Sequence, residues 1–283
     1  MGQTRSLIIG LALVMGPTAG AYAADLGLPP PPPLPVVQPC IGCTGPIYLK
    51  GFIGAANPTV GDISSELFQF NDFEVSHKDI KSSPLFGIGL GYEFNSWLRF
   101  DVTGEYRGKS LFIAQDRFPG GNGSFSIASN AADGAFLPGT NEYTADIESW
   151  VGLANAYIDL GTYFCITPYI GGGVGFASVS VLGLKDVNVP NTSVFYAADN
   201  TETNFAWAVH GGLAYEVNAS MTLDLSYRYT DLGDARSGTV TAYDGSSSYK
   251  SLDIDDINSH DLMLGVRWKL GHQPVAPMPV AFK

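Results

Sequence analysis

The chain has 283 residues, of which only 15% are charged, whereas soluble proteins carry roughly 25%. Its 27 acidic residues outnumber the 15 lysines and arginines, and the resulting net charge of −12 argues against nucleic acid as a partner, because sequence-independent binding needs a basic surface. After residue 23 no apolar run reaches about 18 residues, which excludes a transmembrane helix there.

The first 23 residues have the pattern of a secretory signal peptide. Arg5 precedes an apolar stretch at 7–15, and Ala21-Tyr22-Ala23 forms a small-residue cleavage site. A buried N-terminal helix fits this pattern less well. We therefore expect residues 1–23 to be removed on export.

Two proline-containing segments, 24–45 and 271–283, bracket the rest of the chain. The prolines at 29–39 predict an extended polyproline II conformation, and the second segment is a weaker example. Either segment is interpreted as a semi-rigid periplasmic spacer or as a disordered end. The domain between them is expected to span 46–270.

Within that domain, apolar and polar residues alternate with period two, which is typical of strands with two distinct faces. Five segments show the pattern clearly: 86–94, 98–107, 205–216, 221–229 and 262–270. Three more fit it less cleanly: 46–56, 145–160, whose phase is ambiguous, and the glycine-rich 164–181. The expected count is eight strands, with ten as the alternative.

The strands have the length that crosses a bilayer at a tilt, about 9–11 residues. Aromatic residues mark their ends, as in the interfacial girdles of membrane barrels. One girdle is expected to contain Trp97, Tyr215 and Trp268, and the other Tyr106, Trp207 and Tyr229. These features favour a barrel whose apolar face meets lipid and whose polar face lines the interior.

The connections between these strands alternate between short and long. Tight turns are expected at 95–96, 161–163 and 218–220, and long loops at 57–82, 109–143, 183–203 and 234–257. Outer-membrane barrels combine short periplasmic turns with long extracellular loops. The prediction is an all-β, closed, antiparallel, eight-stranded transmembrane barrel of up-and-down topology, with both termini in the periplasm.

The polar faces carry six positive and six negative side chains, a balance that suggests ion pairs across the lumen. The candidates are Arg99, Asp101, Glu105, Arg107, Asp224, Arg228, Asp261 and Arg267. An eight-stranded barrel is narrow enough for side chains to fill. We therefore expect no wide pore.

Two stretches carry a resemblance to a known family: 227–233 (YRYTDLG) and 157–161 (YIDLG) running into 166–175 (ITPYIGGGVG). The chain resembles the eight-stranded outer-membrane barrels of alphaproteobacteria, which are related to the OmpA transmembrane domain and to opacity-type surface antigens. The resemblance implies a surface protein in contact with outer-membrane lipid and lipopolysaccharide, inserted by the barrel-assembly machinery. Such barrels commonly end in an aromatic residue, whereas here a tail follows Leu270.

Residues for chemistry are sparse, and no cofactor or metal is expected. Ser259-His260-Asp261 lies at the outer end of the last strand, but neighbouring strand residues point to opposite faces and cannot form a triad. The sequence therefore predicts no enzyme. Cys40, Cys43 and Cys165 all fall on the periplasmic side, where disulfides form: either Cys40 pairs with Cys43, or one of them pairs with Cys165.

The function expected from these features is a structural or surface-interaction role in the outer membrane. One alternative is a narrow porin-like channel for small solutes or ions. A second is an outer-membrane enzyme that modifies lipopolysaccharide.

Overall fold

The computed structural model describes residues 47–65, 74–118, 121–122, 135–136, 139–189 and 192–270. The predicted signal peptide, both proline-containing segments, Cys40 and Cys43 lie outside these residues, so the expectations for them stay predictions. No helix in the described ranges is long and apolar enough to cross a membrane.

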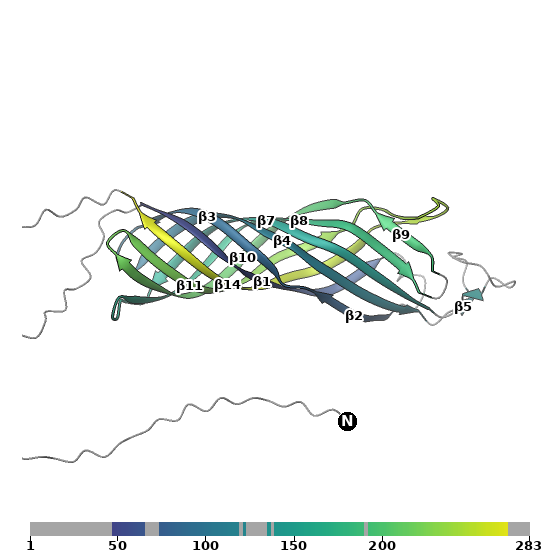
Figure 1. The fold of residues 1–283 in the computed structure, drawn as a ribbon, viewed down its shortest axis with the longest axis horizontal. Helices are drawn as coiled ribbons and strands as arrows, with labels where there is room; N and C mark the ends of the chain where they lie inside the picture. Colours follow the sequence, from purple (N-terminus) through teal and green to yellow (C-terminus); the bar gives the residue numbers. More distant parts are fainter. Residues whose placement is uncertain are drawn as a thin grey trace, which may run out of the picture. The chain divides into compact units, whose positions relative to one another are not determined.

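Eight long strands form a closed ring in which every neighbouring pair is antiparallel (Figure 1). They are β1 (Ile47–Ser65), β3 (Ser83–Glu93), β4 (Leu98–Phe118), β7 (Gly139–Asp159), β8 (Ile166–Asn188), β10 (Asn200–Asn218), β11 (Met221–Arg236) and β14 (Leu252–Lys269). Each pairs with the ring strands before and after it in sequence, and pairing of β1 with β14 closes the ring. This confirms the predicted eight-stranded up-and-down barrel.

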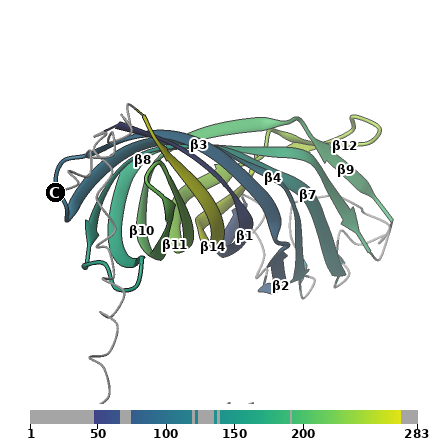
Figure 2. The ribbon, with the colours of Figure 1, turned by 60° about the vertical axis from the view of Figure 1, so that its left-hand side comes forward.

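Short strands extend the barrel at the end that carries the long connections (Figure 2). β2 (Glu74–Ile80) pairs with β4, and β9 (Val194–Ala197) pairs with β8. β12 (Val240–Ala242) pairs with β9 and with β13 (Ser248–Tyr249). β5 (Gly121–Asn122) and β6 (Ala135–Phe136) form a separate two-stranded sheet.

The ring strands continue well past the predicted strand ends. β4 has 21 residues and β8 has 23, so parts of the expected loops 57–82, 109–143, 183–203 and 234–257 are strand. We call the part of the barrel near the tight turns the turn half, which holds residues 98–107 of β4. The remainder is the loop half, which holds residues 109–118.

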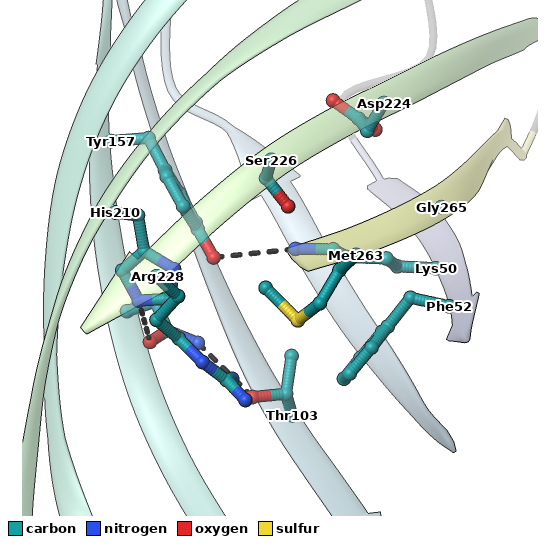
Figure 3. Close-up of a pocket in the computed structure, with 11 residues that line it drawn as sticks. Lys50, Phe52, Thr103, Tyr157, His210, Asp224, Ser226, Arg228, Met263 and Gly265 are labelled. Atoms are coloured by element: carbon teal, nitrogen blue, oxygen red, sulfur yellow. Dashed lines mark hydrogen bonds between the residues drawn. The ribbon is translucent and has the colours of Figure 1, made fainter. Parts of the chain in front are cut away.

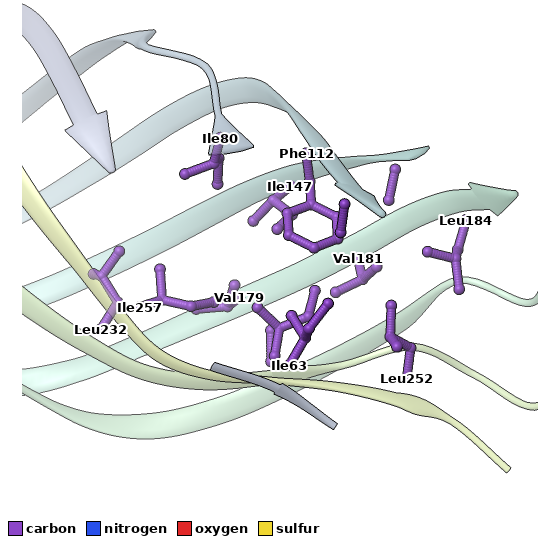
Figure 4. Packing of buried hydrophobic residues seen from close by; sticks show 14 of the residues in the cluster. Ile63, Ile80, Phe112, Ile147, Val179, Val181, Leu184, Leu232, Leu252 and Ile257 are labelled. Carbon is purple, nitrogen blue, oxygen red and sulfur yellow. The ribbon is translucent and has the colours of Figure 1, made fainter. Parts of the chain in front are cut away.

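The two halves have opposite polarity. In the turn half, exposed apolar residues such as Ile53, Ile88 and Val102 cover the outer wall, and charged residues point inward. In the loop half the interior is an apolar core that includes Ile63, Phe112 and Ile254 (Figure 4). Its outer wall carries exposed polar side chains. The turn half therefore has the expected inside-out membrane pattern, and the loop half is built like a water-soluble barrel.

Inward-facing glycines in the turn half make room for aromatic rings on the neighbouring strands. A Cβ atom at Gly91 would meet the ring of Tyr48, and one at Gly87 would meet the ring of Phe52. By contrast, a Cβ atom at the lipid-facing Gly51 would meet nothing within 4 Å. The glycine-rich sequence therefore reflects packing inside a narrow lumen.

Candidate functional site

The lumen of the turn half is filled by three layers of polar side chains. The layer next to the apolar core contains Arg107, Arg228, Glu105 and Asp261, all buried. The Arg107 guanidinium donates two hydrogen bonds to the Asp261 carboxylate, at 2.7 and 3.2 Å. Arg228 Nη2 bridges the two carboxylates, at 2.7 Å from Glu105 Oε1 and 2.8 Å from Asp261 Oδ2. Two cations and two anions are thus paired across the barrel.

The middle layer is centred on the Asp101 carboxylate. Figure 3 shows three of its neighbours, Lys50, Tyr157 and His210, with Lys50 Nζ 3.3 Å from the Tyr157 hydroxyl. Asp101 accepts hydrogen bonds from Asn155 Nδ2 at 2.7 Å and from the Tyr48 hydroxyl at 3.2 Å, and its Oδ2 lies 3.4 Å from Lys50 Nζ. The buried His210 ring lies 3.1 Å from Asn155 Oδ1. Side chains from β1, β4, β7 and β10 therefore meet in one network.

The third layer faces the tight turns. Arg267 Nε donates to Asp224 Oδ2 at 2.7 Å, and Lys269 Nζ donates to Glu93 Oε2 at 2.8 Å. Arg99 Nε lies 3.0 Å from Asp159 Oδ1. The Arg99 guanidinium also stacks on the rings of two inward tyrosines, Tyr157 and Tyr169, at 4.2 and 4.4 Å.

All eight candidate ion-pair residues lie in these layers, but the partners differ from a simple pairing within that set. Asp101 pairs with Lys50, and Arg99 pairs with Asp159. The sequence pattern did not place Asp159 among the lumen charges. It also missed Asn155 and Tyr157. The alternation along 205–216 placed His210 on the inward face, which is confirmed, but did not give its contact with Asn155. In the loop half β7 turns apolar residues toward the core, so both of its faces carry apolar residues and the sequence shows no clear phase. A clear phase would have assigned Asn155 and Tyr157 to the interior.

Two cavities inside the described part of the barrel are very small. The cavity beside Lys50, His210 and Asp224 measures about 10 Å³, and another beside Arg107 and Leu232 about 20 Å³. A single water molecule needs a cavity of roughly 10–15 Å³. In the described part of the barrel these cavities are far smaller than the passage that a hydrated solute requires.

The predicted girdle residues lie on the outer wall at two levels. Trp97, Tyr215 and Trp268 are exposed near the tight turns. At the other level, the ring of Trp207 contacts that of Tyr229 at 5.4 Å, and Tyr106 contacts Trp150 at 4.9 Å. Trp150 was missed because its strand is the one with ambiguous phase.

The structure separates the residues considered for catalysis. Ser259 and Asp261 are buried inside the barrel, whereas His260 is on the outer wall, 2.6 Å from the Tyr227 hydroxyl. Among the described residues, no group of three or more His, Cys, Asp or Glu side chains could hold a metal ion. Cys165 lies in the turn between β7 and β8.

Known proteins share this barrel. The family model of the outer membrane protein beta-barrel domain matches residues 55–269. The chain belongs to this family. An uncharacterized protein of Brucella suis is 28% identical over 232 residues, which cover 75% of each chain. A putative adhesin of Rickettsia conorii is 27% identical over 70% of this chain and 74% of its own. The outer membrane protein PagN of Salmonella typhimurium is 25% identical over 78% of this chain and 89% of its own.

Family membership explains the reversed polarity of the turn half. In an outer-membrane barrel the exposed apolar wall contacts lipid, and the closed ring satisfies every backbone hydrogen bond within it. This outer-membrane barrel therefore sits in the membrane by its turn half. The loop half, with its polar wall and apolar core, stands outside the hydrocarbon layer.

Proposed function

We propose that this outer-membrane barrel is a sealed structural and surface-interaction protein. Its loop half would project from the cell and present β2, β9, β12 and β13 to the surroundings. The observation that carries the proposal is the filled interior: three polar layers and an apolar core occupy the barrel and leave cavities of about 10 and 20 Å³. Selection for transport would favour an open lumen.

The topology that we propose places both termini and the tight turns in the periplasm. Residues 1–23 would then be the signal peptide, and 24–45 and 271–283 would be periplasmic segments in which Cys40, Cys43 and Cys165 meet an oxidising compartment. We further propose that the chain is an OmpA-related, opacity-type barrel inserted by the barrel-assembly machinery. Protease treatment of intact cells should cleave the loop half, and cleavage only in the proline-containing segments would contradict this topology.

A contact role at the cell surface is supported by the relatives. The Rickettsia conorii relative is named a putative adhesin. The separation of His260 from Ser259 and Asp261 supports a non-enzymatic role, because the two buried side chains and the outward histidine lie on opposite faces of the strand. An unchanged lipid A profile after deletion of the gene would agree with this.

Conductance across planar lipid bilayers tests the sealed lumen against the channel alternative. The purified barrel should produce no stable single-channel steps. In the matched variant Arg228→Ala, one large side chain is removed from the layer next to the apolar core. This variant serves as the control in which any leak through the lumen should be easier to detect. Stable conductance of the unmodified protein would overturn the proposal.

A further inference from the structure

The apolar core of the loop half contains two buried carboxylates, Asp116 on β4 and Asp186 on β8, which are 0% and 3% exposed. Asp116 accepts hydrogen bonds from the Tyr143 hydroxyl at 2.6 Å and from the Asn141 side chain at 3.0 Å. Asp186 Oδ2 accepts one from the Tyr249 hydroxyl at 2.7 Å. Asp186 Oδ1 is buried and has no hydrogen-bond partner. The donors that reach these carboxylates are all neutral groups.

No cation compensates these two acids within the described part of the chain. The titratable groups that face Asp186 are Tyr143 from β7, Tyr249 from β13 and Asp116 from β4, while β9 contributes the apolar Phe195. The cations next to the acids in sequence, Arg117 and Lys185, are exposed on the outer wall. An ionised carboxylate buried without a partner is costly, and protonation removes most of that cost.

The proton affinities follow from this burial. Burial, opposed by the hydrogen bond from Tyr249 and aided by the nearby Asp116 carboxylate, raises the pKa of Asp186 to about 7. Burial likewise raises the pKa of Asp116. Burial also holds the pKa of Tyr249 well above its usual range, so that this hydroxyl stays protonated and donates.

Asp186 is covered by a flap made of β9, β12 and β13, that is Val194–Ala197, Val240–Ala242 and Ser248–Tyr249. The flap continues the barrel sheet from β8, and Phe195 stands opposite Asp186 in the pairing register. The rings of Phe195 and Tyr249 lie 5.9 Å apart, and Tyr249 is buried. Loosening this flap would give the Asp186 carboxylate access to water.

We propose that the flap is an acid-closed lid: it packs over the core when Asp186 carries a proton and loosens when that carboxylate is ionised. The closed form binds the proton more tightly than the open form, in which Asp186 has a pKa near 4. Closure is therefore favoured at acidic pH and weakens as the pH rises from about 4 to about 7, by at most about tenfold in the opening equilibrium per pH unit. Above that range both forms are ionised and the dependence levels off.

Hydrogen–deuterium exchange of the full barrel in lipid nanodiscs, corrected for the intrinsic exchange rate at each pH, tests the lid. Amides of the flap, such as that of Ala242 bonded to the Ser247 carbonyl, should open about 10- to 100-fold more at pH 7 than at pH 5. Amides in the turn half should show no such change.

Three variants isolate the responsible group. Asp186→Asn keeps an acceptor for Tyr249 and should leave the flap closed at every pH. Asp116→Asn removes the neighbouring charge and should shift the transition to lower pH. Asp244→Asn, a change of an exposed carboxylate in the same loop, should retain the full pH dependence. Flap protection that is independent of pH in the unmodified protein, or a pH dependence that survives Asp186→Asn, would overturn the proposal.

Discussion

Arg107 and Arg228 share the carboxylates of Glu105 and Asp261 deep inside the barrel, at distances of 2.7–3.2 Å. At this depth each charge is tolerated only because its partners are in place, since an unpaired buried charge costs several kcal/mol. Alternation along each strand assigned these four side chains to the interior. It did not assign their partners, because Arg107 and Asp261 lie on β4 and β14, which are not neighbours in the ring.

Removal of Arg228 should destabilise the barrel strongly. Arg228→Ala leaves Glu105 and Asp261 buried with one cation between them, and the expected loss is about 3–5 kcal/mol in the free energy of unfolding. Urea unfolding in lipid vesicles would measure it. The matched control is Arg236→Ala, which breaks an exposed pair with Asp253 and should cost at most about 1 kcal/mol. Equal losses in the two variants would contradict the assignment of a buried network.

At the scale of the strands, the change of polarity coincides with irregularities in pairing. On β4 the register shifts between Arg107 and Ser110, and inward positions change from odd to even numbers there. Comparable shifts occur at Gly233 on β11 and near Gly183 on β8, both of which have positive φ, a conformation that glycine adopts readily. The sequence pattern breaks at these positions, which explains why the predicted strands ended there.

The position of the polarity change can be tested on one strand face. Val102 and Gln115 both lie on the outer wall of β4, the first in the turn half and the second in the loop half. Val102→Arg places a charge in lipid and should cost about 2–4 kcal/mol near the bilayer midplane. Gln115→Arg stays in water and should change stability by about 0.5 kcal/mol or less. Unfolding in vesicles measures both, and a large loss for Gln115→Arg would move the membrane boundary toward the loops.

On the scale of the whole molecule, the closed ring combines two environments in one set of strands. The turn half buries charge and exposes apolar surface to lipid, and the loop half buries an apolar core at the end that carries the long connections. Aromatic side chains form two levels on the outer wall, one near the tight turns and one near the loop half.

The four tryptophans report on this arrangement directly. Trp97 and Trp268 belong to the level near the tight turns, and Trp150 and Trp207 to the level near the loop half. In variants that retain one tryptophan each, fluorescence should be quenched most by bromines placed near the lipid headgroups, because interfacial aromatic side chains lie at that depth. Strongest quenching by bromines at the bilayer midplane would show that an aromatic level has been misplaced.

The sequence by itself determined the class of the fold, the number of ring strands and, on every ring strand with a clear phase, which residues of the turn half face inward, because the period of alternation is a local property of a strand. On β7 it did not, because the phase of 145–160 is ambiguous. Only the tertiary structure decided which charges pair across the lumen and that the strands continue past the membrane. Those features depend on contacts between strands far apart in sequence and on bulges that reset the alternation. The reversal of polarity that hid the second half of each strand from the sequence pattern is the same feature that places an apolar core inside the loop half.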